Sequence, residues 1–166
     1  METRFTAIEL AAMRDAGDIA RMSRDEIEHG LQWRWRPEAI RAMIRDSESS
    51  VIVSRLQTPL PEAAAGTLMG FAAMRFGFET AHLNLLAVDP RCRRQGLGRE
   101  LLDWLVLTAH TAGLDRIDLE VRARNQGAQR FYRAAGFAPG KTIPGYYQGQ
   151  ETAVRMHKWL DSVARR

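Results

Sequence analysis

One run of the chain, residues 81–122, constrains the fold more than any other. It begins with the apolar segment AHLNLLAV (81–88) and passes through a loop that contains Gly96 and Gly98. It continues as the helix-like LGRELLDWLVLTAHTAG (97–113) and ends in RIDLEVR (116–122), where apolar and charged residues alternate with the period of a strand. A strand–helix–strand crossover of this kind predicts a mixed α/β domain.

The sequence before the crossover supplies further elements. The apolar patterns predict two helices and three strands there: a strand at 3–10, helices at 15–29 and from Pro37 to Ile44, and strands at 51–56 and 66–77. Proline suits the first position of a helix, as at Pro37. The strands at 66–77 and 81–88 should form a hairpin that turns near Glu79 and Thr80.

The sequence after the crossover predicts a short helix and a last strand. Asn125 is a good N-cap for the helix in NQGAQRFYRAAG. Pro139 and Pro144 should interrupt the chain before the last strand at 151–160. The complete order is βααβββαβαββ, and at 166 residues we expect one domain over 1–166.

Composition excludes several classes of protein. The chain is 45% hydrophobic and 27% charged, as in ordinary globular proteins. It has no run of about 18 apolar residues, so we expect no membrane span, and the N-terminus lacks the apolar core of a signal peptide, which favours a cytoplasmic protein. The single Cys92 cannot form an internal disulfide, and the four scattered histidines predict no metal site.

The charge favours an anionic partner. The formal net charge is +4 and the pI is about 9.8. Charge alone does not separate nucleic acid from a phosphorylated cofactor, but the arginines are scattered rather than clustered on one element. We therefore expect no nucleic-acid partner, and a monomer or a homodimer.

The loop CRRQGLGRELL (92–102) has the features of an anion site. Glycines let the backbone approach a ligand, and the first N–H groups of a helix have no intrahelical partner. No GK followed by Ser or Thr is present, as a P-loop needs, and Leu101 replaces the third glycine of a dinucleotide fingerprint. The alternative is that Gly96 and Gly98 serve only to turn the chain.

Three segments in order resemble the GNAT N-acetyltransferase superfamily. VDPRCRRQGLGRELL is similar to its motif A, whose basic or amide residue and two small residues are matched by Arg93, Gly96 and Gly98. LEVRARNQGAQRFYRAAGF is similar to the motif that follows. GYYQGQETAVRM resembles the terminal segment of the ribosomal-protein-alanine N-acetyltransferases, which acetylate protein N-termini. The resemblance covers residues 81–156 well.

The resemblance implies a fold and a cofactor. The fold would be a mixed, mostly antiparallel sheet flanked by helices, and the cofactor would be acetyl-CoA, with no metal. Strand-edge backbone groups would face the pantetheine arm, the glycine loop would wrap the pyrophosphate, and Asn125 would lie near the thioester. The implied cofactor residues are Leu86, Ala87, Val88, Arg93, Arg94, Gln95, Gly96, Leu97, Gly98, Arg99 and Asn125.

The same resemblance implies two catalytic residues. Glu120 would accept the proton of the attacking amine and Tyr132 would protonate the departing thiolate. The alternative for Glu120 is a surface carboxylate that pairs with Arg116 or Arg122. The alternative for Tyr132 is a half-buried packing residue.

The acceptor side of the family layout is flanked by two aromatic pairs. Trp33 and Trp35 could line an acceptor groove or could cap the core, and Tyr146 and Tyr147 face the same choice. Gly145 precedes the tyrosines and Glu151-Thr152-Ala153 follows them, which departs from the subgroup's pattern and bears on the substrate more than on the chemistry.

An N-terminal amine is the favoured acceptor. Its pKa lies about 2.5 units below that of a lysine amine, a difference of about 3.4 kcal/mol in deprotonation. The alternatives are a small-molecule amine or antibiotic as acceptor, and a noncatalytic module that binds a cofactor or nucleic acid. Direct transfer in a ternary complex is favoured over an acyl-enzyme, because Cys92 has no histidine near it in the sequence.

Overall fold

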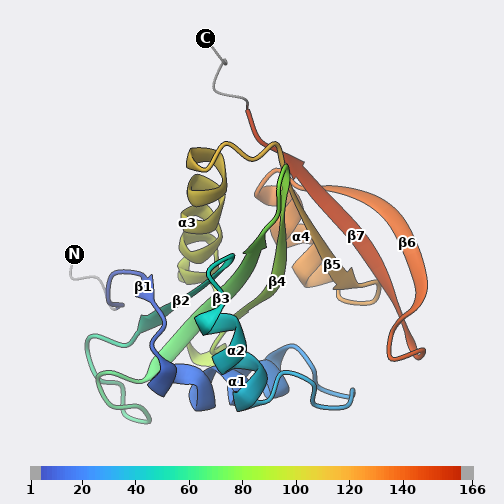
Figure 1. Cartoon of the computed structure of the whole chain (residues 1–166). Helices are drawn as coiled ribbons and strands as arrows, with labels where there is room; N and C mark the ends of the chain where they lie inside the picture. Colours follow the sequence, from blue (N-terminus) through green and yellow to red (C-terminus); the bar gives the residue numbers. More distant parts are fainter. Residues whose placement is uncertain (1–4, 162–166) are drawn as a thin grey trace. The chain divides into compact units, whose positions relative to one another are not determined.

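The computed structural model describes residues 5–161 (Figure 1). The elements, in chain order, are β1 (Glu9–Leu10), the 3₁₀ turn η1 (Met13–Asp15), α1 (Ala16–Glu26), α2 (Pro37–Arg45), β2 (Ser49–Arg55), β3 (Leu68–Phe76), β4 (Thr80–Val88), the 3₁₀ turn η2 (Pro90–Cys92), α3 (Leu97–Thr111), β5 (Arg116–Arg122), α4 (Gln126–Ala134), β6 (Ala138–Tyr147) and β7 (Glu151–Trp159). The predicted order of helices and strands is confirmed.

The strands form a seven-stranded sheet in the order β1-β2-β3-β4-β5-β7-β6. The pairs β1/β2, β5/β7 and β6/β7 are antiparallel, whereas β4 and β5 are parallel because α3 carries the chain between them. This confirms the predicted mixed, mostly antiparallel sheet with flanking helices.

The contacts between Cα atoms group the chain into two compact units. Unit 1 comprises residues 1–74 and 85–105, and unit 2 comprises residues 75–84 and 106–166. The elements β3, β4 and α3 each contribute residues to both units. The prediction of one domain over 1–166 stays a prediction, and the units are described one at a time.

Unit 1 buries apolar side chains on both faces of β3. Phe71 and Ala73 belong to a core cluster with Ile19 of α1 and Ile40 of α2. On the other face α3 lies close to Gly70, where an added Cβ would be 3.0 Å from Leu101 and 3.1 Å from Leu97. A larger residue would therefore push the first turns of α3 away from the sheet.

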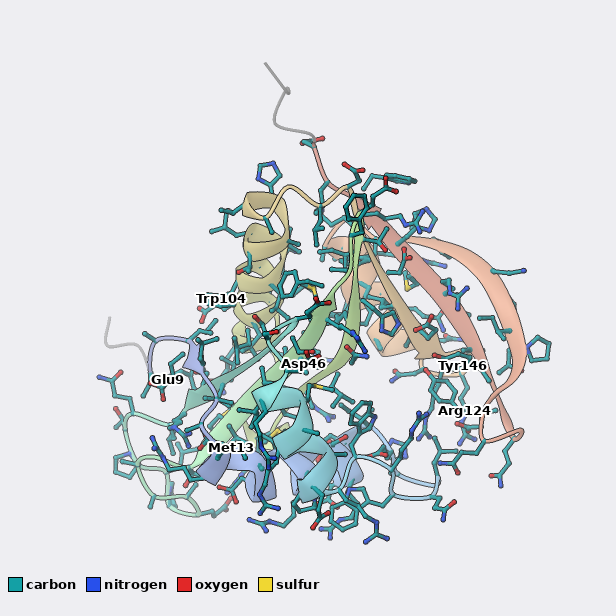
Figure 2. All side chains as sticks on the ribbon, viewed as in Figure 1. Glu9, Met13, Asp46, Trp104, Arg124 and Tyr146 are labelled. Atoms are coloured by element: carbon teal, nitrogen blue, oxygen red, sulfur yellow. The ribbon has the colours of Figure 1, made fainter. Side chains whose placement is uncertain are left out.

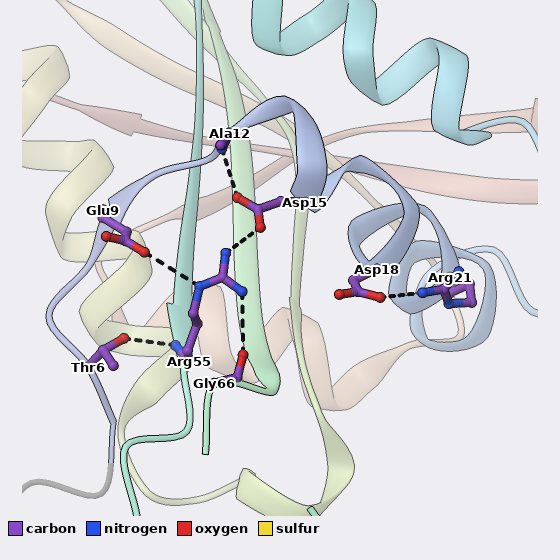
Figure 3. Close-up of polar contacts among 8 residues, drawn as sticks. All are labelled: Thr6, Glu9, Ala12, Asp15, Asp18, Arg21, Arg55 and Gly66. Atoms are coloured by element: carbon purple, nitrogen blue, oxygen red, sulfur yellow. Dashed lines mark hydrogen bonds and ion pairs between the residues drawn. The ribbon is translucent and has the colours of Figure 1, made fainter. Parts of the chain in front are cut away.

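A buried ion pair attaches the N-terminal segment to β2. The guanidinium of Arg55 contacts the carboxylate of Asp15, which also accepts the N–H of Ala12 at 2.7 Å (Figure 3). Thr6 Oγ1 accepts the N–H of Arg55 at 3.0 Å, and Glu9 pairs with its guanidinium at 3.5 Å. These contacts fix the start of α1 relative to the sheet.

Unit 2 confirms the alternation of β5. Ile117, Leu119 and Val121 are buried, whereas Asp118 and Glu120 lie on the other face. Asn125 caps α4, since its side chain accepts the N–H of Ala128 at 3.1 Å. The predicted cap is thus confirmed.

Two predicted boundaries were wrong. The first strand is limited to β1 with an isolated bridge at Phe5, and residues 3 and 4 of the predicted strand lie outside the described residues. The helix predicted at 15–29 ends at Glu26, and the carboxylate of Glu28 instead holds the loop that follows.

The prolines at 139 and 144 do not interrupt the chain. Both lie in β6, which is the last strand of the sheet order and has register shifts after Pro139 and after Ile143. An edge strand tolerates proline because one of its sides needs no N–H donor, and the shifts absorb the remaining mismatch.

Candidate active site

The loop between β4 and α3 is anchored at its start by Asp89. The N–H of Asp89 donates to the carbonyl of Met69 at 2.7 Å, and its carboxylate accepts the N–H of Arg91 at 2.9 Å. The guanidinium of Arg91 and this hydrogen bond hold the pKa of the Asp89 carboxyl below its usual value, against the opposite effect of burial. Cys92 is buried with its thiol 3.3 Å from the Met69 sulfur, so it is enclosed by the core.

The backbone then takes two left-handed steps before α3 begins. Arg94 has φ of 61° and Gly96 has φ of 85°. A left-handed residue other than glycine is uncommon, and alternation of backbone handedness turns successive N–H groups toward a common point. Arg93 to Gly96 are exposed, whereas the side chain of Leu97 is buried. Any contact of Leu97 with a ligand would therefore involve its backbone.

Arg93 is already paired within unit 1. Its guanidinium lies 2.5 Å from the carboxylate of Glu26 in the last turn of α1. Sequence reasoning did not identify Glu26. Because the Arg93 side chain is already paired, we expect any anion binding by this loop to depend mainly on its exposed backbone.

The parallel pairing of β4 with β5 ends before either strand does. It runs from Thr80 opposite Arg116 to Leu83 opposite Leu119, and β4 then continues to Val88. The predicted cofactor residues Leu86, Ala87 and Val88 lie beyond the last pair. Ala87 is buried, and Leu86 and Val88 are half-buried.

Glu120 in unit 2 is a nearly buried carboxylate with two partners. One oxygen lies 2.5 Å from Nε2 of His82, and the other accepts from Nε of Arg155 at 3.0 Å. The Glu120 side chain is 7% exposed, against 39% for His82. The expected alternative partners were wrong, because Arg116 pairs with Asp118 and Arg122 pairs with Glu151.

The electrostatic surroundings keep Glu120 ionised. Burial by itself would raise its pKa, but the hydrogen bond and charge of His82, and then those of Arg155, lower it below the ordinary value. Glu120 is therefore a carboxylate at neutral pH.

Asn84 extends this pair to a third residue. Its Nδ2 lies 3.1 Å from Nδ1 of His82, which assigns the hydrogen of the imidazole to Nε2, facing Glu120. Asn84 Oδ1 is buried and has no hydrogen-bond partner among residues 5–161. Turning the amide over would present this oxygen to Nδ1, so Asn84 can accommodate both a neutral and a protonated His82.

Tyr132 packs in the interior of unit 2. Its ring makes edge contacts with Phe131 at 5.1 Å and with Phe137 at 5.7 Å between centroids. Burial, and secondarily the nearby Tyr147, raises the pKa of Tyr132, so the phenol holds its proton at neutral pH. The packing role predicted as the alternative is present, and it is compatible with proton donation.

Tyr147 interacts electrostatically with both predicted catalytic residues, Glu120 and Tyr132. Burial raises its pKa most, and the charges of Tyr146 and Glu120 raise it further. The rings of Tyr146 and Tyr147 meet edge to face at 4.9 Å, and Arg122 stacks on Tyr147 at 6.0 Å. Unit 2 therefore brings together Glu120, Tyr132 and Tyr147.

A charged cluster holds the turn end of the β6–β7 hairpin beside the tyrosines. Glu151 at the start of β7 pairs with the buried Arg122, at 3.2 Å, and with the exposed Arg124. Figure 2 draws Arg124 and Tyr146 toward this end of unit 2. Sequence reasoning noted Glu151 only as part of a pattern and did not predict that it orders the hairpin.

One side-chain atom of Asn125 is already used in capping α4. Its Oδ1 caps α4, so a cofactor contact would have to use the amide Nδ2.

Trp33 and Trp35 in unit 1 pack half-buried against the core cluster. Trp33 donates its indole N–H to the carbonyl of Trp35 at 3.1 Å. The alternative role as a cap on the core is therefore present, and acceptor binding by these residues stays a prediction.

The sequence profile of the Acetyltransferase (GNAT) family matches residues 18–137, which is more than half of the chain. The motif-A loop, the β4–β5 pairing and the carboxylate on β5 lie within this range. The chain therefore belongs to the GNAT family.

Three relatives illustrate the similarity. The chain is 37% identical over 94 residues to the ribosomal protein bS18-alanine N-acetyltransferase of Escherichia coli, a match that spans 55% of this chain and 64% of that enzyme. It superposes on Ard1 from Thermoplasma volcanium with a TM-score of 0.81 and 25% identity, over 95% of this chain and 99% of that one. Arabidopsis thaliana NAA60 in complex with acetyl-CoA has the same fold, with a TM-score of 0.81 and 13% identity over 94% and 99% of the two chains. The match thus covers less than two thirds of the length of the curated E. coli relative.

Residues 5–161 contain neither a membrane-spanning helix nor a cluster of metal ligands. None of the described helices is long and apolar enough to cross a membrane. The described residues also contain no group of three or more His, Cys, Asp or Glu side chains arranged to hold a metal ion.

Proposed function

We propose that this protein transfers the acetyl group of acetyl-CoA to the α-amino group of a protein or peptide N-terminus. The observation that carries the proposal is the His82–Glu120 contact of 2.5 Å, in which a nearly buried carboxylate supports a more exposed imidazole on the neighbouring parallel strand. An imidazole held by a carboxylate is a common general base, and a base must accept the proton that the attacking ammonium group loses.

The His82–Glu120 pair takes the proton from the amine, and Glu120 stabilises the imidazolium that forms. This differs from the role of Glu120 alone that the sequence predicts, because His82 is the more exposed member of the pair, with 39% of its side chain exposed against 7% for Glu120. Asn84 turns its amide so that Oδ1 accepts from the newly protonated Nδ1. Since the two groups are coupled, the proton belongs to the pair rather than to either residue.

Tyr132 completes the proton balance. The neutral amine nitrogen attacks the thioester carbonyl carbon, the C–N bond forms and the C–S bond breaks. Tyr132 donates its hydroxyl proton to the departing thiolate, and solvent replaces that proton. The raised pKa of Tyr132 ensures that the proton is present at the start of the step.

The cofactor side is assigned to the loop of unit 1. The left-handed backbone at Arg94 and Gly96 and the first N–H groups of α3 suit a pyrophosphate, each charge-assisted hydrogen bond contributing about 1.5–3 kcal/mol. The backbone of Leu86 to Val88 suits the pantetheine arm, and Asn125 Nδ2 the region of the thioester. The enclosed Cys92 supports direct transfer rather than an acyl-enzyme.

The acceptor is tested with two panels. An N-terminal amine is easier to deprotonate than a lysine amine by about 2.5 pKa units, so the pair needs less driving force. We expect turnover with peptides that begin with Ala or Ser, measured by mass spectrometry of the acetylated product. Turnover confined to a panel of small amines and antibiotics would replace the proposal with a small-molecule acetyltransferase. A thermal-shift titration without any response to acetyl-CoA would contradict both.

A further inference from the structure

The loop between α1 and α2 is held in place by hydrogen bonds to a buried glutamate. Glu28 is a buried carboxylate whose Oε1 accepts the N–H groups of Arg34 at 2.8 Å and Trp35 at 3.0 Å. Its Oε2 accepts the hydroxyl of the buried Ser23 at 2.9 Å. A buried charge with three donors of this kind fixes the path of the backbone.

This fixed loop displays arginines on a pair of indole rings. Two guanidinium groups contact the ring of Trp33, that of Arg24 at 5.3 Å and that of Arg36 at 4.9 Å from the ring centroid. Arg34 stacks on Trp35 at 6.0 Å. Stacking on an aromatic face leaves the N–H edge of a guanidinium free to bind a carboxylate, while it restricts the side chain's motion.

The charge of this surface is only partly neutralised. All three arginines are exposed. Arg24 pairs with its neighbour Asp25 at 2.8 Å, whereas the ion pairs formed within residues 5–161 include none with Arg34 or Arg36. The loop therefore presents two guanidinium groups, those of Arg34 and Arg36, which stack on half-buried tryptophans and have no acidic partner in an ion pair among residues 5–161.

We propose that this loop binds carboxylates of the acceptor polypeptide, so that the enzyme prefers acidic acceptor polypeptides. The inference rests on the proposed function, because it concerns the polypeptide that carries the acetylated amine. Planar guanidinium groups match a carboxylate with two parallel hydrogen bonds, and the flanking indoles supply contact area for the peptide chain. A short acidic segment fits two neighbouring cations, whereas nucleic acid needs a broad basic face.

The test compares two peptides that differ only in the residues after a common first residue, which are Glu in one and Gln in the other. We expect the wild-type protein to have a kcat/KM about tenfold higher for the Glu peptide, the size of two partly exposed charge pairs. The double variant Arg34→Gln/Arg36→Gln should lose this preference while its kcat/KM for the Gln peptide is unchanged. Arg45→Gln, an exposed arginine in the last turn of α2, is the matched control and should keep the preference.

Fluorescence anisotropy measures the binding of a labelled Glu peptide without requiring acetyl transfer. It therefore distinguishes a failure of the proposed function from a failure of the proposed acidic preference. If neither peptide is acetylated but the Glu peptide still binds through Arg34 and Arg36, the proposed function fails and the acidic preference of the loop stands. If both peptides are acetylated equally, or if the double variant keeps the preference, the loop is not a specificity element. Displacement of the peptide by a short oligonucleotide at lower concentration than by an unlabelled Glu peptide would also overturn the proposal.

Discussion

The motif-A loop of unit 1 and the β4–β5 site of unit 2 are built on different principles. The loop offers exposed backbone, held in shape by the left-handed residues Arg94 and Gly96. The strand site offers side chains, and its central carboxylate, Glu120, is almost enclosed by His82 and Arg155. The loop suits binding of an anion with a fixed charge, such as a pyrophosphate. The strand site suits reversible proton transfer.

This difference predicts different responses to mutation. The loop should depend on backbone conformation and tolerate the loss of side chains. The strand site should depend on side-chain chemistry and tolerate only changes that preserve shape. Substitutions in the two regions should therefore affect different kinetic constants.

The largest effect is expected for Glu120→Gln. The amide keeps the shape but removes the charge that stabilises a protonated His82, so kcat should fall by about 10³-fold, within the range of general base catalysis. Acetyl-CoA affinity, measured by titration calorimetry, should change little. A variant with near-normal kcat would remove Glu120 from the chemistry.

Tyr132→Phe should lower kcat by about 10²-fold, because the leaving thiolate loses its proton donor. The phenyl ring retains the edge contacts with Phe131 and Phe137, so the melting temperature should stay close to that of the wild type. Stopped-flow detection of free coenzyme A measures the step. An unchanged rate would leave Tyr132 as a packing residue only.

On the loop, Gly96→Val should weaken acetyl-CoA binding by about tenfold, because a left-handed backbone costs a non-glycine residue roughly 1–2 kcal/mol. The cost is conformational, since an added Cβ would meet no atom within 4 Å. Arg93→Ala should cost less than about threefold, as expected for an exposed side chain that is already paired with Glu26. Titrations with the reverse order would contradict the assignment of binding to the backbone.

The smallest effect is expected for Arg155→Gln, which should raise the pKa of Glu120. Burial already favours the protonated form, and Arg155 is one of two groups that oppose it. A carboxylate with a lowered pKa stabilises the fold above its unfolded pKa, and this stabilisation is lost as the pH falls through the folded value. The variant should therefore lose part of this pH-dependent stability. An NMR titration of the Glu120 carboxyl that gives an equal or lower pKa would refute this.

The same contrast explains what the sequence could predict. The glycine loop, the alternation of β5 and the Asn125 cap are local patterns. The structure confirms the alternation and the cap, whereas anion binding by the loop stays a prediction. The partners of Glu120 are not local. His82 and Arg155 reach it only through the parallel pairing of β4 with β5 and the antiparallel pairing of β5 with β7. A predicted register for the crossover strands would have placed His82 opposite Asp118 and hence near Glu120.

Other misses have the same cause. Glu28 was predicted to lie inside a helix, yet it folds back to hold Arg34 and Trp35 across a turn that no short pattern encodes. The prolines of β6 signal a break in a central strand but are tolerated at an edge, and edge position is a property of the whole sheet.

The central claim is that His82 and Glu120 act as one proton acceptor, and a double-mutant cycle tests it most directly. The single-turnover rate of acetyl transfer to an Ala-peptide, at saturating acetyl-CoA, is measured for the wild type, His82→Gln, Glu120→Gln and the double variant. Because the two residues share one function, the double variant should be no slower than the slower single variant. Rate losses that multiply in the double variant would show that the residues act independently and would contradict the account.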